Sequence, residues 1–282
     1  MEVVLDLRKS VSENAQEYYS KAKKSRRKVA GARKALEDTK RKISALEKKQ
    51  EKILEEKTEP GLKRKEIRKT EWFEKFRWFH SSDGFLVVGG KDATSNEILV
   101  KKHIDPSDTV FHAEIQGAPF FAIKNPKGVE VPESTLTEAA QGAVSYSKAW
   151  PSGMGAADAY WVTPEQVSKS APSGEYLTKG AFMIRGKKNF FRRTPLKVAI
   201  GIKFDERALP IVLGGPISSI KKNTDAHVVI EPGNVKSGQL AKEIRVAFIK
   251  KSKKELLETI KKIPPQEIQQ WIPGGKGRIS KD

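Results

Sequence analysis

Residues 12–57 read SENAQEYYSKAKKSRRKVAGARKALEDTKRKISALEKKQEKILEEK and contain no proline and a single glycine. Small and apolar residues return within them at alternating steps of three and four. These positions are Ala15, Tyr18, Ala22, Ser25, Val29, Ala32, Leu36, Thr39, Ile43, Leu46, Gln50 and Ile53. A seven-residue spacing held over this length predicts one long helix of a coiled coil.

A turn at residues 58–61 follows this helix. Glu59-Pro60-Gly61 ends the helical pattern because proline lacks an amide donor and glycine permits a reversed chain direction. Residues 62–79 predict a second helix that ends in an aromatic cluster. Residues 1–80 are therefore expected to form an antiparallel coiled-coil helical hairpin, and self-association through its seam is left open.

From Ser81 onward, short apolar segments alternate with turn residues. Strands are predicted at 85–88, 97–104, 109–115, 120–125, 159–163, 181–186, 197–204, 210–213 and 227–232. Helices are predicted at 132–150, with Thr135 and Glu138 as a capping box, and at 237–263. The glycine-rich residues 274–278 predict a mobile basic tail.

The predicted fold class is α+β: a long coiled-coil helical hairpin precedes a mixed, mainly antiparallel sheet domain with flanking helices. The expected divisions are residues 1–80, a sheet domain at 81–235, and a basic C-terminal helix and flexible tail at 236–282.

Composition narrows the functional classes. The 282 residues include 54 Lys and Arg against 35 Asp and Glu, which gives a formal net charge of +19. This balance favours a polyanionic partner. The chain has no cysteine, so disulfides, a thiol nucleophile and cysteine-based metal sites are excluded. Its apolar runs are far shorter than the roughly 20 residues that a bilayer requires, so we expect a cytoplasmic protein without membrane contact.

Three basic segments are candidates for contact with RNA. Residues 21–34 carry eight cations and no acid. Residues 181–193 interleave cations with phenylalanines, and no acid occurs between Glu175 and Asp205. Cations neutralise phosphates and aromatic rings stack on unpaired bases, although the phenylalanines are also ordinary core residues. Residues 236–262 carry nine cations and three acids, which is equally typical of a solvated surface.

The candidate RNA-binding residues belong to the first two segments, with three further lysines that would extend the surface. They are Arg185, Lys187, Lys188, Arg192, Arg193, Lys101, Lys102, Lys124, Lys23, Lys24, Arg26 and Arg27.

Catalytic motifs are weak. The stretch Gly180 to Lys188 departs from a phosphate loop in its glycine spacing and in having Lys188 where Ser or Thr would hold magnesium. The four histidines show no paired-ligand spacing. We therefore predict no catalytic residue, no metal and no cofactor. A nucleotide-dependent enzyme that uses this loop is the alternative.

Several ordered blocks of sequence resemble the NFACT proteins, the group of NEMF and the bacterial RqcH factors. The resemblance covers about residues 3 to 205. It is carried by Asn14-Ala15-x-x-Tyr18-Tyr19, Trp72-Phe73-Glu74-Lys75-Phe76-x-Trp78-Phe79, Gly89-Gly90-Lys91-Asp92-Ala93-x-x-Asn96-Glu97, Val110-x-His112-Ala113-Glu114, Pro172-Ser173-Gly174-Glu175-Tyr176 and Phe182-Met183-Ile184-Arg185-Gly186-Lys187-Lys188-Asn189-Phe190.

The resemblance implies a middle coiled coil followed by the RNA-binding domain called NFACT-R. It also implies a role in ribosome-associated quality control, with the large ribosomal subunit and its rRNA as partners and tRNA or peptidyl-tRNA as a further partner. The full-length proteins support untemplated tailing of the stalled nascent chain. The family's N-terminal domain has no counterpart here, so we expect a fragment or a shorter variant. The alternatives are a general nucleic-acid-binding module and a protein-interaction scaffold or adhesin.

Overall fold

The computed structural model describes residues 4–55, 71–115, 117–170, 177–206 and 208–280. The chain forms two compact units, Met1–Lys69 and Thr70–Asp282, and each is described by itself. Among the described residues, no helix is long and apolar enough to cross a membrane.

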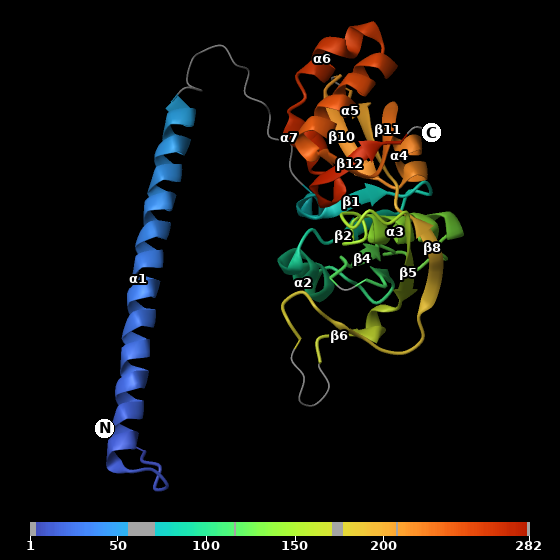
Figure 1. Ribbon diagram of the computed structural model, residues 1–282. Coiled ribbons are helices and arrows are strands. Elements are labelled where there is room, and N and C mark those ends of the chain that lie inside the picture. Colours follow the sequence, from blue (N-terminus) through green and yellow to red (C-terminus); the bar gives the residue numbers. More distant parts are fainter. Residues whose placement is uncertain (1–3, 56–70, 116, 171–176, 207, 281–282) are drawn as a thin grey trace. The chain divides into compact units, whose positions relative to one another are not determined.

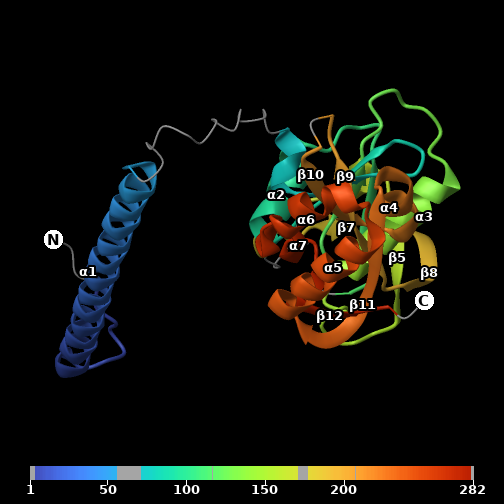
Figure 2. The ribbon, with the colours of Figure 1, turned by 90° about the horizontal axis from the view of Figure 1, so that it is seen from above.

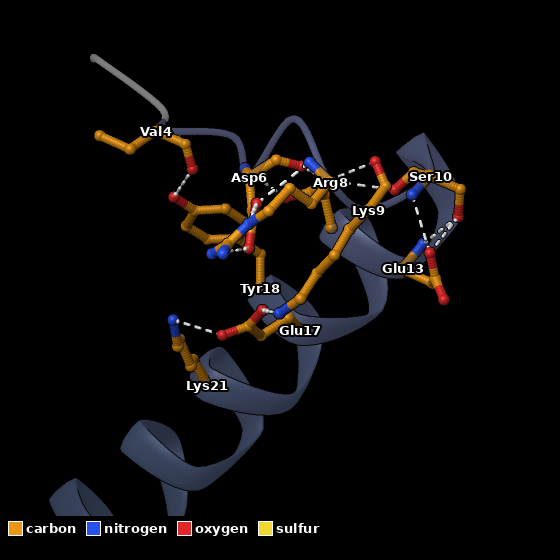
Figure 3. A network of polar contacts seen from close by, with 10 residues as sticks. Val4, Asp6, Arg8, Lys9, Ser10, Glu13, Glu17, Tyr18 and Lys21 are labelled. Atoms are coloured by element: carbon orange, nitrogen blue, oxygen red, sulfur yellow. Dashed lines mark hydrogen bonds and ion pairs between the residues drawn. The ribbon is translucent and has the colours of Figure 1, made fainter.

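The first unit contains one long helix, α1 (Val11–Glu55), which confirms the helix predicted at 12–57 (Figure 1). A capping box starts it: the Ser10 N–H donates to Glu13 Oε2 at 2.7 Å, and the Glu13 N–H donates to Ser10 Oγ at 3.2 Å (Figure 3). These two bonds satisfy amide groups that have no partner inside the helix.

The residues before α1 fold back onto its first turns. The side chain of Asn14 accepts the Asp6 N–H at 2.9 Å and donates to the Asp6 carbonyl at 3.0 Å. The Tyr18 hydroxyl donates to the Val4 carbonyl at 2.7 Å (Figure 3). Asn14 and Tyr18, two residues of the first sequence block, therefore hold the preceding segment against the helix.

The second helix predicted at 62–79 is wrong over residues 72–79, and its residues 62–70 lie outside the described part of the chain. Trp72–Lys75 forms a single 3₁₀ turn, η1, and Arg77–His80 forms strand β1. Aromatic side chains favour strands, and the pairing of β1 with β2 (Leu86–Gly89) outweighs the helical spacing.

Six antiparallel strands form the larger sheet of the second unit, in the order β1-β2-β4-β3-β5-β8. The other four are β3 (Thr109–Ala113), β4 (Phe121–Ile123), β5 (Ala156–Val162) and β8 (Asn189–Pro195). Helix α3 (Glu133–Ser145) packs on this sheet through buried alanines and Val144. A short separate pair joins β6 (Val167–Ser168), which follows the turn η2 (Pro164–Gln166), to β7 (Met183–Ile184).

Four antiparallel strands form the second sheet, in the order β10-β9-β11-β12. They are β9 (Val198–Phe204), β10 (Pro210–Gly215), β11 (Ala226–Lys236) and β12 (Lys276–Ile279). Helices and 3₁₀ turns between residues 217 and 275 pack against this sheet and against one another, and Figure 1 and Figure 2 show the helices from two sides. They are α4 (Ile217–Asn223), α5 (Ser237–Lys251), η3 (Lys254–Leu256), α6 (Leu257–Lys261), α7 (Pro265–Gln269) and η4 (Pro273–Gly275).

One hydrophobic core joins the two sheets. It contains Phe111 and Phe121 from the larger sheet, Ile200 from the smaller sheet and Phe248 from α5, all fully buried. Burial of large apolar side chains on both sheets makes residues 70–282 one folded body. The α+β class with a mainly antiparallel sheet is confirmed.

The strand predicted at 97–104 is wrong, because Ala93–Lys102 forms helix α2. Its first turn is fixed by a reciprocal cap. The Asp92 carboxylate accepts the Ser95 N–H at 2.8 Å, and the Ser95 hydroxyl accepts the Asp92 N–H at 2.8 Å. The two hydrogen bonds of this cap stabilise the start of the helix, and this stabilisation outweighs the preference of the segment's β-branched residues for a strand.

The basic tail predicted at 274–278 is also wrong, because Lys276–Ile279 forms β12 and pairs with β11. The Trp150 indole N–H donates to the Lys276 carbonyl at 2.7 Å, and Arg278 pairs with Glu231 at 2.8 Å. The helix predicted at 237–263 is interrupted: α5 ends at Lys251, and α6 begins at Leu257.

The helix predicted at 132–150 is confirmed in a shorter form as α3, but its capping box is wrong. Thr135 does not cap the helix; its hydroxyl donates to Asp83 Oδ2 at 2.7 Å. The buried Glu138 accepts the Ser82 N–H at 2.8 Å and the Ser218 hydroxyl at 2.5 Å. Both side chains therefore join α3 to distant segments rather than to its own first turn.

Candidate nucleic-acid interface

The five cations predicted between residues 185 and 193 lie on the turn between β7 and β8 and on β8 itself, and we call them the β7–β8 cations: Arg185, Lys187, Lys188, Arg192 and Arg193. A tight turn presents the first two. The Gln166 amide donates to the carbonyls of Arg185 at 2.7 Å and Lys187 at 3.0 Å. Gly186 adopts a φ of 81°, and a Cβ there would come within 2.8 Å of the Gln166 amide nitrogen.

Strand β8 carries the other part of this surface. Phe191 packs against the core, with its ring centroid 6.2 Å from that of Phe111, whereas Phe190 is exposed. The guanidinium of Arg192 lies 3.8 Å from the Phe190 ring centroid. The phenylalanines of the segment therefore divide between core and surface, and Phe190 offers an aromatic face among cations.

Carboxylates neutralise two of the β7–β8 cations. Arg192 pairs with Asp158 at 2.6 Å, and hydrogen bonding from that guanidinium lowers the pKa of the Asp158 carboxyl. Lys188 pairs with Glu114 at 3.3 Å, and Arg192 reaches the same carboxylate at 3.7 Å. Lys188 and Arg192 thus share two acids from β5 and from the segment after β3.

The remaining three β7–β8 cations are exposed. Among the described residues, no carboxylate lies within ion-pair distance of Arg185, Lys187 or Arg193. The Arg185 guanidinium donates to the Ser170 carbonyl at 3.3 Å. Arg193 adopts a φ of 50°, and its N–H donates to Asp158 Oδ1 at 2.8 Å. Arg185 and Lys187 therefore keep their full charge, whereas the charge of Arg193 still acts on Asp158 and lowers the pKa of that carboxyl.

Lys124 does not extend this surface, because its side chain is only 12% exposed. Its ammonium donates to the His103 carbonyl at 2.7 Å and to the Asp105 carboxylate at 2.7 Å, and it also contacts Asp108. The Asp108 side chain is fully buried. Lys124 therefore links the end of β4 to the loop before β3 and has a structural role.

Lys101 and Lys102 lie exposed in the last turn of α2. Lys101 pairs with Glu97 at 2.7 Å, and Glu97 also accepts the Gly180 N–H at 3.1 Å. These hydrogen bonds, that from Lys101 foremost, lower the pKa of Glu97 to about 2. Lys101 is thus partly neutralised, and Lys102 has no carboxylate partner among the described residues.

The cations predicted on the first unit lie on α1. Lys23, Lys24, Arg26 and Arg27 are all exposed, and none has an ion-pair partner in the described residues. The seam is exposed as well: Tyr18, Val29, Leu36 and Ile43 are between 41% and 58% accessible. The described part of α1 therefore presents both an unneutralised basic stretch and an apolar seam.

The body contains a cavity of about 670 Å³ that the sequence did not predict. Its rim carries Lys91, Lys148 and Lys179, and Lys188 also lines it. Lys91, Lys148 and Lys179 come from separate segments of the sequence, so no run of charge predicted that they would meet. Lys188 was already a candidate from the basic segment 181–193. The only partial signal was the stretch Gly180 to Lys188, which forms part of the wall.

Two polar aromatic residues line the same cavity. Burial lowers the pKa of His112 to about 4, and burial raises the pKa of Tyr160 to about 12. His112 is therefore neutral and the Tyr160 phenol protonated at neutral pH. The two side chains contact each other at 3.4 Å, between the Tyr160 hydroxyl and His112 Nδ1. Among the described residues, no group of His, Asp and Glu side chains has the arrangement of a metal site.

Two family models match the chain over residues 1–186. Residues 75–186 match the model of the NFACT protein RNA-binding domain, and residues 1–76 match that of the NFACT N-terminal and middle domains. The chain belongs to the NFACT family. The resemblance stated from the sequence blocks is thereby confirmed.

Several curated relatives are named as subunits of a ribosome quality control complex. The archaeal Rqc2 homolog aRqcH of Methanocaldococcus jannaschii is 47% identical over 195 residues, which cover 69% of this chain and 29% of that protein. The ribosome quality control complex subunit NEMF of Homo sapiens is 44% identical over 195 residues, covering 68% and 17%. The chain thus spans less than a third of the length of these relatives.

Among solved structures, the C-terminal part of the fibronectin/fibrinogen-binding protein from Streptococcus suis is similar. Its TM-score is 0.36 at 22% identity, with 66% of this chain and 77% of that chain covered. A similarity of this size carries no argument about function.

Proposed function

We propose that this chain is the RNA-binding part of a ribosome-associated quality-control factor that acts in the cytoplasm. The observation that carries the proposal is the surface at Arg185, Lys187 and Arg193, at and just beyond the end of the matched RNA-binding domain, where no carboxylate of the described residues lies within ion-pair distance of these three exposed cations. Unneutralised cations attract phosphates and release counterions when they bind them. The exposed Phe190 adds a face on which an unpaired base can stack.

The large ribosomal subunit that still carries peptidyl-tRNA after a stall is the proposed target. The names of the curated relatives support a ribosomal partner. Within the full-length protein, this part would support untemplated tailing of the nascent chain by binding, without a catalytic residue of its own. Lys23, Lys24, Arg26 and Arg27 of α1 would supply a second contact with rRNA.

Sedimentation of the full chain with purified large subunits tests this proposal. The chain should sediment with subunits that hold peptidyl-tRNA, and the amount bound should fall steeply as salt increases. Equal binding to subunits, tRNA and duplex DNA would instead indicate a general nucleic-acid-binding module. Retention of a protein partner after nuclease treatment, without subunit binding, would indicate a scaffold.

A further inference from the structure

We propose that the cavity rimmed by Lys91, Lys148 and Lys179 binds one unpaired nucleotide of the RNA. The proposal rests on the RNA-binding function above and assigns the site at which a base is held. The cavity volume of about 670 Å³ lies within the range of roughly 300–1,000 Å³ that is usual for small-molecule sites.

The rim of the cavity is positively charged. Four lysines line the cavity, one of which, Lys188, pairs with Glu114, whereas Asp92 is the only acid among the described lining residues. The Asp92 carboxylate is already engaged as the cap of α2, where it accepts the Ser95 N–H and hydroxyl at 2.8 and 3.0 Å. The pKa of Lys91 is lowered by partial burial and by the nearby charge of Arg77. The rim therefore has cations in excess, as a phosphate group requires.

The wall of the cavity is aromatic. Phe120, Tyr160 and Phe182 line it, and the Phe120 and Phe182 ring centroids are 5.6 Å apart in an edge-to-face arrangement. Phe182 is half-buried, with Lys169 lying 4.9 Å from its ring centroid. Phe120 and Tyr160 are only 3% and 4% exposed and support Phe182 from behind, so Phe182 is the ring available to a base beside the cationic rim.

Neutral polar groups complete the wall. His112 and Tyr160 are uncharged at neutral pH, and the His112 Nε2 lies 3.2 Å from the Ala118 carbonyl. Because both His112 nitrogens are engaged, by the Ala118 carbonyl and the Tyr160 hydroxyl, the group that remains for the edge of a base is the acceptor oxygen of Tyr160. A free inorganic phosphate would use the rim alone and leave this wall without a partner.

Local hydrogen bonds hold the cavity open. The Asn96 side chain accepts the Phe120 N–H at 3.2 Å, and Glu97 accepts the Gly180 N–H at 3.1 Å. Gly180 has a φ of 78°, and a Cβ there would lie 2.6 Å from the Ala93 carbonyl oxygen. Helix α2 is thereby joined to both loops that line the site, so little ordering is needed when a nucleotide enters.

A single-stranded oligoribonucleotide that carries one 2-aminopurine tests the site with the full chain. Stacking quenches the fluorescence of this base, so wild-type protein should quench it on binding. The double variant Lys148→Glu, Lys179→Glu should bind the oligonucleotide about ten- to a hundredfold more weakly. Lys242→Glu, Lys250→Glu provides a matched control, because both lysines are exposed on α5 and do not line the cavity.

Phe182→Ala separates base from phosphate contacts. It should reduce quenching while the affinity falls by less than about tenfold, since the rim is unchanged. Adenosine monophosphate should displace the probe, and inorganic phosphate at equal ionic strength should not. Binding of RNA without quenching, or equal displacement by phosphate, would overturn the nucleotide site and leave the RNA-binding proposal standing. Absence of any RNA binding would instead contradict the function.

Discussion

Two regions of the body carry cations that look alike in the sequence. In the structure these cations differ in burial and in their carboxylate partners. At the end of β4, Lys124 is buried and contacts Asp105 and Asp108. Between β7 and β8, Arg185 and Lys187 are exposed on a turn and have no carboxylate partner among the described residues. The charge composition of the sequence alone does not distinguish Lys124 from Arg185 and Lys187.

The difference shows which cations are available to a partner. A lysine held by a buried carboxylate must first lose that contact before it can bind a phosphate, and the loss costs free energy. An exposed cation without a carboxylate meets no such cost. The RNA surface is therefore expected at the turn between β7 and β8 and not at Lys124.

The largest effect is expected from Lys124→Met. The variant leaves the fully buried Asp108 carboxylate without its cation, so the free energy of unfolding should fall by about 3–5 kcal/mol. Urea unfolding followed by circular dichroism measures it. Lys127→Met is the matched control, because Lys127 is exposed in the next turn. Equal stability of the two variants would show that Lys124 is not structural.

The second prediction concerns the exposed cations of the other region. The triple variant Arg185→Glu, Lys187→Glu, Arg193→Glu should bind single-stranded RNA roughly a hundredfold more weakly, because three phosphate contacts become repulsive. Its free energy of unfolding should change by less than about 1 kcal/mol, since exposed charges contribute little. Fluorescence anisotropy and urea unfolding measure the two quantities.

The control for this triple variant is Lys221→Glu, Lys242→Glu, Lys250→Glu, which makes the same change in net charge at exposed positions on α4 and α5. If both triple variants lose affinity to the same extent, net charge alone explains binding, and the assignment to the turn between β7 and β8 is wrong.

The third prediction uses His112, whose buried ring lies beside Lys188. Its pKa is about 4 in the folded chain against an ordinary 6.5, so the unfolded chain binds more protons between these values. Folding stability is complete above the unfolded pKa and falls as pH decreases toward 4. Between about pH 7.5 and about pH 5.0, the wild type should lose about 2 kcal/mol more than His112→Gln.

Urea unfolding of both proteins at the two pH values measures this difference. The other described histidines are present in both proteins, so their titration cancels in the comparison. An identical pH dependence of the two proteins would show that burial does not hold His112 neutral.

The smallest effect is expected from Glu114→Gln. Loss of this carboxylate releases Lys188 and weakens the neutralisation of Arg192, so affinity for RNA should increase about threefold. Glu255→Gln, at an exposed position on η3, is the control. A decrease in affinity would indicate that Glu114 positions the two cations instead of competing for them.

The sequence predicted the parts of the fold that depend on local pattern. The spacing of apolar residues predicted α1, and the short apolar segments predicted most strands of both sheets. It failed where pairing between strands that are distant in the sequence determines the secondary structure. Residues 72–79 have helical spacing and form η1 and β1 because β1 pairs with β2, and residues 276–279 become β12 only by pairing with β11.

The candidate site was predictable only in part. The absence of acids between Glu175 and Asp205 indicated a basic surface, and Arg185 and Lys187 do lie exposed there. The sequence could not show that carboxylates neutralise Arg192. Asp158 and Glu114 are distant from Arg192 in the sequence and come within ion-pair distance of it only in the folded chain. The cavity could not be seen either, since the turns and strands that line it meet only in the folded chain.

The salt dependence of RNA binding tests the central claim most directly. If about six phosphates are neutralised, the logarithm of the association constant for unpaired RNA should fall with a slope near −4 to −5 against the logarithm of salt concentration. Arg185→Gln, Lys187→Gln, Arg193→Gln should reduce the steepness of this slope by about 2. A flat response of the wild type, or an unchanged slope in the variant, would contradict the claim that these exposed cations contact RNA.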